Sequence, residues 1–467
     1  MPRLQAAFAV TIVGAGLVAL PPVMPPPPKA QARSVRLTAV DTADSPLGDG
    51  TAFIIGGSGL PTPGQAYADI ADTLYLAPRD FTGTTQIVTT PEELYPFLGP
   101  FGGTFDPSVA QGAQNVDAAI QSQIATGEVD AAHPAVIFGY SQGADVETST
   151  MSLLSGQHVP SNEAHFVMIG DPANPNGGML ERFDLPAGTQ PTVPSLGLTF
   201  SGGTPDDLYP TDIYTHEYDG FADFPQYPIN FLADINALLG IAFEHTTYLG
   251  VTPTQIADAI QLPTSSADTL TDYYMLPAGL PLLEPLQLIP FVGNPLYDLL
   301  EPDMSVLVNL GYGDIADGWS QGDADVPTTL GLLPSSSVLD QVPQALANGL
   351  QQGITDFFKD LASPSNYMYS LPAWAEELIG SAKAIPGSQF SVLSPVPTTP
   401  ADLFDTFPPH TGIPPLDVAT ALLITLPEMG YHVFTTDMAD GNDADAIGIP
   451  IAALLGILPL ALVGAVI

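Results

Sequence analysis

The sequence predicts an α/β fold in which helices flank a mainly parallel β-sheet. Two observations support this prediction. From residue 51 to about residue 224, short apolar runs alternate with segments of helical periodicity, which is the pattern of strands joined by crossover helices. One apolar run, residues 135–138, leads directly into a glycine-flanked turn and a helical segment, which is typical of a buried parallel strand that feeds a helix.

The predicted elements come in the order of an α/β-hydrolase core. The predicted strands are residues 53–55, 135–138, 166–169 and 212–218. Helices are expected at residues 66–74, 106–127 and 144–156. The second of these begins with a capping Asp106 followed by Pro107 and ends at Gly127, which are favoured residues at helix starts and ends.

The strongest local signal is the G-x-S-x-G sequence from Gly139 to Gly143, at the junction of a strand and a helix. A sharp strand-to-helix turn requires small neighbours, which the two glycines supply, and it lifts the hydroxyl of Ser141 above the sheet edge. The same turn puts the backbone N–H of Gln142 at a helix N-terminus, where an oxyanion can be held. Such a short motif also arises by chance in a chain with 44 glycines, so the strand and helix around it are what predict a nucleophile rather than a structural turn serine.

The glycine-rich turn at residues 56–59 follows the first predicted strand and has two interpretations. As a phosphate loop it lacks both a lysine and the G-x-G-x-x-G pattern. As the loop after an early strand of a hydrolase sheet, it supplies a second oxyanion donor from the backbone of Gly57 or Ser58. A tight turn without chemistry is the alternative.

A serine nucleophile needs a base and an orienting acid, and hydrolases of this topology carry them in the order Ser, Asp, His. Among the seven histidines, His245 follows a helical run and has polar neighbours, which suits a base in an exposed loop. His216 lies within a strand, so it is expected to pack on a sheet face. Asp219 comes directly after that strand, where the turn faces the catalytic edge. The rival acids are Asp171 and Asp223.

The charge balance excludes several classes of function. The chain has 50 acidic and only 8 basic residues, for a formal net charge of −42, which repels nucleic-acid phosphates and anionic membranes. It has no cysteine, so disulfides, thiolate metal sites and a cysteine nucleophile are excluded. Two acidic loops, at residues 314–325 and 437–445, do not fit the calcium-loop spacing. We therefore expect no metal and no other cofactor.

The first 32 residues are predicted to direct export rather than to belong to the fold. A short basic start precedes the uncharged apolar run 4–23, and Ala30-Gln31-Ala32 has the form of a cleavage site. The run is also long enough to be a retained membrane anchor, which stays open. A cytoplasmic apolar helix is the third alternative. The two leading ones place the rest of the chain outside the cytoplasm, secreted or in the cell envelope. Residues 33–50 are interpreted as a linker.

Two apolar segments follow the predicted catalytic residues. Residues 276–302 are rich in Leu and Pro and form either a lid or acyl-binding wall, or an insertion that caps the core. Residues 446–467 are uncharged and long enough to span a bilayer, but two prolines interrupt them and no basic residue flanks them, so membrane association and a packed tail both stay open. Residues 334–445 are Pro-rich, and their role is not predicted.

Four segments in order resemble the PE-PPE domain family, whose members are cutinase-like serine α/β-hydrolases of mycobacteria and relatives. They are GYSQGA at 139–144, IGDPANPNGG at 169–178, EYDGFADFPQYP at 217–228 and NLGYGD at 309–314. The resemblance covers about residues 51–333, which we take as the hydrolase domain, and it puts the family's Ser, Asp and His on Ser141, Asp219 and His245. No PE or PPE helical module precedes this domain, which favours a simple export segment, and the disulfides usual in cutinases cannot form here.

The resemblance implies an esterase or lipase that acts on acyl esters, or an acyltransferase that moves acyl chains between cell-envelope glycolipids. In both reactions Ser141 attacks the ester carbonyl, His245 accepts its proton and Asp219 orients the imidazole, while Gln142 and the Gly57–Ser58 backbone stabilise the oxyanion. Water as acceptor gives hydrolysis, whereas a sugar hydroxyl gives transfer. The competing class is a non-catalytic surface or envelope protein on the same scaffold, and the candidate Ser, Asp and His argue against it.

Overall fold

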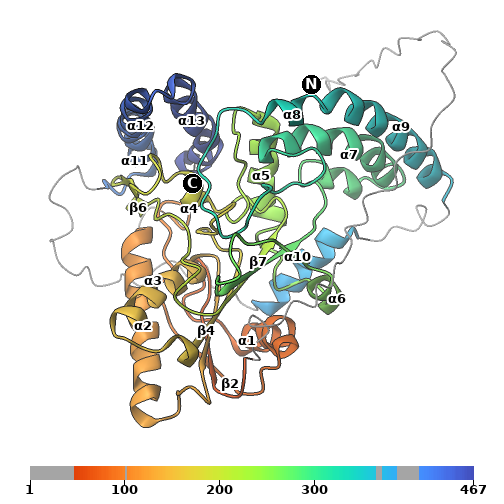
Figure 1. Cartoon of the computed structure of the whole chain (residues 1–467). Coiled ribbons are helices and arrows are strands. Elements are labelled where there is room, and N and C mark those ends of the chain that lie inside the picture. Colours follow the sequence, from red (N-terminus) through yellow and green to blue (C-terminus); the bar gives the residue numbers. More distant parts are fainter. Residues whose placement is uncertain (1–46, 100–101, 364–370, 386–409, 467) are drawn as a thin grey trace, which may run out of the picture. The chain divides into compact units, whose positions relative to one another are not determined.

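A seven-stranded β-sheet with helices on both faces organises the chain (Figure 1). The structure is a computed structural model that describes residues 47–99, 102–363, 371–385 and 410–466. The sheet has the order β2-β1-β3-β4-β7-β9-β8, and neighbouring strands are parallel except for β8, which is antiparallel to β9. The predicted α/β class is therefore confirmed. The predicted export segment at residues 1–32 lies outside the described residues, as does the predicted linker up to residue 46.

The strands are short, and a separate two-stranded ribbon pairs β5 with β6. Their bounds are Thr51–Ile54 for β1, Thr84–Ile87 for β2, Ala135–Tyr140 for β3, Ala164–Ile169 for β4, Thr192–Val193 for β5, Leu198–Thr199 for β6, Thr211–His216 for β7, Ile260–Gln261 for β8 and Thr271–Leu276 for β9.

The central strand β3 explains why apolar runs predicted this sheet. In β3, Ile137 lies opposite Phe53 of β1 and Phe166 of β4. Ile137 packs in the cluster that contains the apolar side chains of α2 and α3, while Val136 and Phe138 pack in the cluster that contains those of α1. Since both faces are covered, the strand is a continuous apolar run without a polar side.

Helices α2 and α3 cover one face of the sheet, and α1 covers the other. Gly127 ends α2 in the left-handed conformation at φ +76°, as its position predicted. The helix bounds are Gln65–Ala71 for α1, Phe105–Thr126 for α2, Gln142–Gly156 for α3, Met179–Arg182 for α4, Phe231–Phe243 for α5, Pro253–Ala257 for α6, Gly293–Asn309 for α7, Ser336–Leu339 for α8, Val342–Leu361 for α9, Ala373–Ala384 for α10, Pro414–Thr420 for α11, Leu426–Asp440 for α12 and Asp443–Val466 for α13.

Two strands, β8 and β9, lie beyond residue 224, where the sequence analysis named none. Strand β9 follows α5 and pairs in parallel with β7, and β8 then closes that edge. Strand β7 also ends at His216, two residues before its predicted end, and Tyr218 turns the chain with a φ of +66°. The early end of β7 places Asp219 in the turn after the strand.

The C-terminal residues 410–466 form a helical group of α11, α12 and α13, which lie together in Figure 1. Helix α13 continues through Pro450 and Pro459, which were expected to interrupt it. Each proline removes a helical hydrogen bond, so packing of α13 against α12, α11 and α5 stabilises the continuous helix.

Candidate active site

Ser141 lies at the sharp turn between β3 and α3. Its φ of +57° and ψ of −123° are rare for a residue with a side chain, and its N–H donates to the carbonyl of Ile169 at 3.0 Å. An added Cβ on Gly139 would lie 2.6 Å from the carbonyl oxygen of Gly143, and one on Gly143 would lie 2.3 Å from the carbonyl oxygen of Gly56. The motif needs both glycines because the backbone of α3 approaches its neighbours too closely for any side chain.

The structure brings Ser141, His245 and Asp219 into one chain of hydrogen bonds. The Nε2 atom of His245 lies 2.8 Å from Ser141 Oγ, and its Nδ1 lies 2.7 Å from Asp219 Oδ2 and 2.9 Å from Oδ1. Since a carboxylate only accepts, Nδ1 carries the proton and Nε2 accepts from the serine hydroxyl. Ser141 follows the end of β3, Asp219 lies in the turn after β7, and His245 lies in the segment after α5.

Asp219 is held as a carboxylate at this position. The hydroxyl of Tyr248 donates to Oδ2 at 2.8 Å, and the N–H of Phe221 donates to Oδ1 at 2.9 Å. Complete burial by itself raises the pKa of Asp219, but the neighbouring His245 and these donors outweigh burial and hold that pKa below its ordinary value.

The rival acids hydrogen-bond elsewhere. Asp171 accepts from the N–H of Ala173 and the hydroxyl of Thr204, and Asp223 accepts from the N–H of Tyr218. Burial raises the pKa of both carboxyls, that of Asp171 to about 6. These hydrogen bonds hold the two carboxyl groups within the turns that follow β4 and β7, and the carboxyl group that hydrogen-bonds to His245 is that of Asp219.

His245 is buried, at 5% exposure, where the sequence predicted an exposed loop. The ring of Phe221 packs against the imidazole with centroids 4.8 Å apart, and the hydroxyl of Tyr140 donates to the His245 carbonyl at 2.6 Å. Polar neighbours in sequence misled that prediction, because contacts from other segments cover the loop. His216 is buried beside Tyr248, as its position in the strand predicted.

The residues predicted to hold an oxyanion lie around Ser141. Gln142 is the first residue of α3, so its N–H has no intrahelical acceptor, and its side chain is fixed by donating to the Glu93 carbonyl at 2.7 Å. An added Cβ on Gly57 would lie 3.2 Å from Ser141 Cβ, and Ser58 lines the same cavity as Ser141. The role of Glu93 in fixing Gln142 was not predicted, since nothing in the local sequence links the two.

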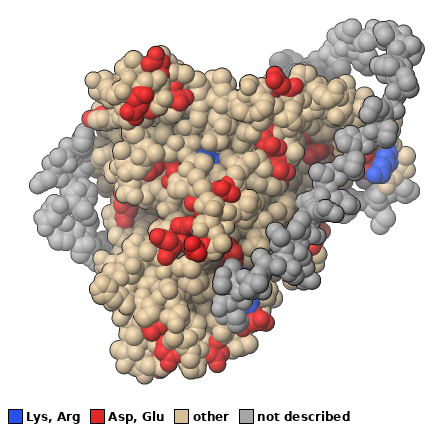
Figure 2. Space-filling view, in the orientation of Figure 1, with Lys and Arg blue, Asp and Glu red and all other residues tan. Residues whose placement is uncertain are grey.

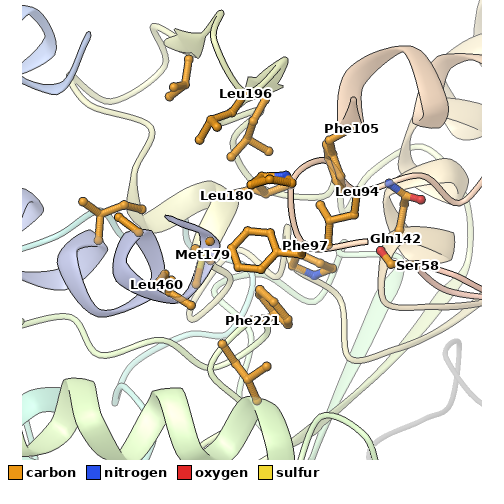
Figure 3. Close-up of a pocket in the computed structure, with 18 of the residues that line it drawn as sticks. Ser58, Leu94, Phe97, Phe105, Gln142, Met179, Leu180, Leu196, Phe221 and Leu460 are labelled. Atoms are coloured by element: carbon orange, nitrogen blue, oxygen red, sulfur yellow. The ribbon is translucent and has the colours of Figure 1, made fainter. Parts of the chain in front are cut away.

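An apolar cavity of about 300 Å³ opens beside Ser141 and His245. Figure 3 shows Ser58 and Gln142 together at one end, with Phe97, Phe221 and Met179 among the side chains that line the rest. The C-terminal helical group also supplies apolar wall residues, which are Val418, Ala421, Leu422, Leu426, Ile457, Leu460, Ala461 and Gly464.

Residues 276–302, for which a lid or acyl-binding wall was one of two predicted roles, do not line this cavity. Leu280 and Leu283 instead pack in a cluster with Tyr218 and Tyr312, and the segment then enters α7. The observed packing agrees with the alternative expectation of an insertion that caps the core. Part of the wall comes instead from residues 418–426, whose role was not predicted, and from residues 457–464, which lie in the tail expected either to associate with a membrane or to pack.

Comparison with known proteins places part of the chain in a family. Residues 82–313 match the family model described as the PE-PPE domain. The chain contains a PE-PPE domain. That match includes Ser141, Asp219 and His245 and ends before the C-terminal helical group, so the cavity is lined by residues from inside and outside the PE-PPE domain.

Three relatives come from Mycobacterium tuberculosis. A PPE family protein, PPE28, is 38% identical over 421 residues, which cover 86% of this chain and 62% of that protein. Esterase PE16 is 45% identical over 313 residues, covering 65% of this chain and 56% of PE16. The SL1278 acyltransferase Chp1 is 30% identical over 210 residues, covering 44% of this chain and 48% of Chp1. The chain therefore spans less than two thirds of the length of each of these relatives.

Proposed function

We propose that this chain is a serine esterase or lipase that hydrolyses acyl esters, with Ser141, His245 and Asp219 as its catalytic residues. The observation that carries the proposal is the hydrogen-bonded chain from Ser141 Oγ through His245 to Asp219, beside an apolar cavity. The similarity to esterase PE16 supports the same reaction class. We further propose residues 51–333 as the catalytic domain.

In the first step, Ser141 Oγ attacks the ester carbonyl while His245 Nε2 takes its proton, and the carbonyl oxygen becomes an oxyanion. The imidazolium, stabilised by Asp219, then gives that proton to the departing alcohol as the ester C–O bond breaks. An acyl-enzyme remains. Water attacks it with His245 again as base, and the return of the proton to Ser141 Oγ releases the carboxylic acid.

The oxyanion needs donors that are fixed before reaction. The N–H of Gln142 meets this requirement because it begins α3 and its side chain is anchored to Glu93. The backbone of Gly57 or Ser58 supplies the second donor, since this turn packs against Ser141. Such a donor contributes about 3–4 kcal/mol to the transition state in other hydrolases.

Acyl transfer is the second candidate function, and two observations favour it. Chp1, a relative, is an acyltransferase by name. Ser141 is only 9% exposed and lies beside an apolar cavity, and exclusion of water lengthens the life of an acyl-enzyme until another hydroxyl arrives. A glycolipid hydroxyl is the acceptor that we propose for this alternative.

A fluorophosphonate probe on the purified chain tests the nucleophile. The wild type should label, Ser141→Ala should not, and its ester hydrolysis should fall about 10⁴-fold or more. Ser152→Ala is the matched control, because this exposed serine lies on the same helix α3. Labelling that survives Ser141→Ala, or no labelling of the wild type, leaves the non-catalytic envelope protein as the better account.

Incubation of a labelled acyl donor with and without a glycolipid acceptor separates the two reactions. Free fatty acid formed in both incubations supports hydrolysis. An acylated glycolipid formed only with acceptor, with little free acid in its absence, supports transfer instead.

We also propose that the chain is exported to the cell envelope or beyond, from the apolar run and A-x-A site in residues 1–32. A reporter enzyme active only outside the cytoplasm, fused after residue 50, tests this. No reporter activity outside the cytoplasm would contradict it, and N-terminal sequencing of exported protein separates cleavage from retention as an anchor.

A further inference from the structure

Helix α13 has a composition that is unusual for a helix exposed to water. Its only charged residues are Asp443 and Asp445 in the first turn, and residues 446–466 contain no polar side chain. A helix at a protein surface normally presents polar residues to solvent. In the described part of the chain, Asp443–Gly464 is the segment long and apolar enough to cross a membrane, by length and composition alone.

One side of α13 belongs to the cavity. Leu460, Ala461 and Gly464 line it, and Leu460 is buried. Only 28% of the most apolar stretch of α13 is buried, whereas a core helix of a water-soluble protein is mostly buried. Other side chains of the helix, such as Ile449 and Ala453, are half-buried against the core. Its exposed side chains beyond residue 446 are aliphatic.

The exposed apolar side chains of α12, α13 and the π-helical segment Ala421–Thr425 before α12 form what we call the outer apolar face. On α13, Ile447, Ile451 and Leu454 recur at the spacing of one helical face. On α12, Tyr431, Phe434 and Met438 do the same. Its further members are Leu423, Ile424, Leu462 and Val463, of which Leu423 is 76% exposed. Exposed apolar patches of this kind mark interaction sites.

The charges around this face restrict what it can bind. Residues 410–466 contain no lysine or arginine, and four aspartates (437, 440, 443 and 445) gather at the turn between α12 and α13. Figure 2, in the orientation of Figure 1, shows acidic side chains over this end of the helices. An anionic membrane would be repelled, since membrane binding of that type relies on basic residues.

We propose that the outer apolar face docks the protein on a lipid surface without net negative charge. Along α13 the face presents aliphatic side chains alone, since residues 446–466 contain no hydrogen-bonding side chain, and this length and composition suit the apolar part of a lipid layer. Because the same helices form a wall of the cavity, docking brings that cavity to the lipid that supplies an acyl chain. The docking itself does not depend on the proposed esterase activity.

Vesicle flotation of the full chain tests this docking, with Ser141→Ala introduced so that no lipid is turned over. We expect flotation with phosphatidylcholine vesicles, and weaker flotation when phosphatidylglycerol is added. The triple variant Leu423→Glu, Ile451→Glu and Leu462→Glu should lower partition about 100-fold or more, because three apolar side chains leave the lipid. None of the three lines the cavity.

A matched triple variant, Leu350→Glu, Ile354→Glu and Phe358→Glu, places the same charges at exposed apolar positions of α9 and should float like the parent. The proposal would be overturned if both triple variants lost flotation equally or if the Ser141→Ala parent did not float. Stronger flotation with the anionic lipid than without it would also overturn the proposal. A dimer in light scattering that the first triple abolishes, with flotation unchanged, would assign the face to a second copy of this chain. Probe labelling of the triples with Ser141 intact reports their folding and separates this result from the proposed function.

Discussion

At the scale of single residues, the turn that carries Ser141 leaves no space for a side chain at Gly143. We predict that Gly143→Ala pushes α3 away from Gly56, because the new Cβ would lie 2.3 Å from that carbonyl oxygen. Overpacking of this kind costs about 1–3 kcal/mol of stability, and a shift of 1 Å in a catalytic group can cost about 100-fold in rate. Ester hydrolysis and thermal unfolding measure the two effects.

Gly156→Ala on the same helix is the control, because nothing lies within 4 Å of its Cβ position. It should leave activity unchanged and stability within about 1 kcal/mol. If Gly143→Ala leaves activity and stability as unchanged as Gly156→Ala does, the turn at Ser141 can accommodate a side chain at residue 143, contrary to the prediction.

Substitution of Tyr248 tests how much the hydrogen bond from its hydroxyl to Asp219 contributes to catalysis. Its hydroxyl donates to Asp219 Oδ2 and accepts from the N–H of His216 at 2.8 Å. A hydrogen bond to a charged group contributes about 1.5–3 kcal/mol, so Tyr248→Phe should lower kcat about tenfold or more with a smaller change in KM. Tyr75→Phe controls for lost stability, since that buried hydroxyl donates to the Tyr248 carbonyl instead. An unchanged kcat in Tyr248→Phe would show that Asp219 needs no such donor.

Local signals were enough to propose Ser141, and chain order was enough to propose Asp219 and His245. Tyr248 and Glu93 escaped prediction for a physical reason. Each acts through a contact between segments that are distant in sequence, as Glu93 does with Gln142. The burial of His245 escaped for the same reason, because Phe221 and Tyr140 cover it from other loops.

At the scale of helices and strands, the strands with continuous apolar runs were predictable, and the strands at or next to the sheet edges were not. Strand β3 is apolar throughout, whereas β2 at one edge contains three polar residues among its four. Strand β9 alternates buried and half-buried positions and begins with Thr271 and Asp272, so it lacks the continuous apolar run of a central strand. Neither periodicity nor composition identifies a strand of this kind without its neighbours.

Helix α13 allows a direct test of the cavity wall. Ala461 lines the cavity and its neighbour Leu462 is 59% exposed, so Ala461→Phe adds bulk inside the cavity and Leu462→Phe adds it outside. We predict that Ala461→Phe lowers kcat/KM for a long-chain ester about tenfold or more, because a ring fills part of a cavity of about 300 Å³. Acetyl ester hydrolysis should change little in either variant. Equal effects on both esters would mean that the acyl chain does not enter this cavity.

At the scale of the whole molecule, the protein combines a formal net charge of −42 with several buried carboxyl groups whose pKa burial raises. Burial raises the pKa of Glu92 and Asp234 to about 8, and of Glu181 and Glu217 to about 7. In the unfolded chain these groups ionise near pH 4. The folded state therefore binds more protons than the unfolded state between about pH 4 and pH 8, so stability falls as pH rises through that range.

Among these buried carboxyl groups, Glu284 has a strongly raised pKa and allows a direct test. Burial, followed by the neighbouring Glu244 carboxyl, raises its pKa to about 10 from an ordinary value of 4.5. The stability that goes with its protonated form is complete below about pH 4.5 and is lost as pH rises toward 10. Glu284→Gln keeps an uncharged side chain of the same shape that can still donate to Glu244. We predict that it raises the melting temperature at pH 8–9 and changes it little at pH 5.

The exposed Glu376→Gln removes the same formal charge at the surface and separates burial from net charge. If the buried carboxyl groups cause the pH dependence of the melting temperature, the curve of Glu376→Gln against pH follows that of the wild type. In that case 0.5 M salt raises the melting temperature of both proteins at every pH, and the slope of each curve stays the same. If self-repulsion among the acidic residues dominates, the two variants shift the curve alike and salt flattens it, because salt screens exposed charges far more than buried ones. That second pattern would contradict the protonated state assigned to Glu284.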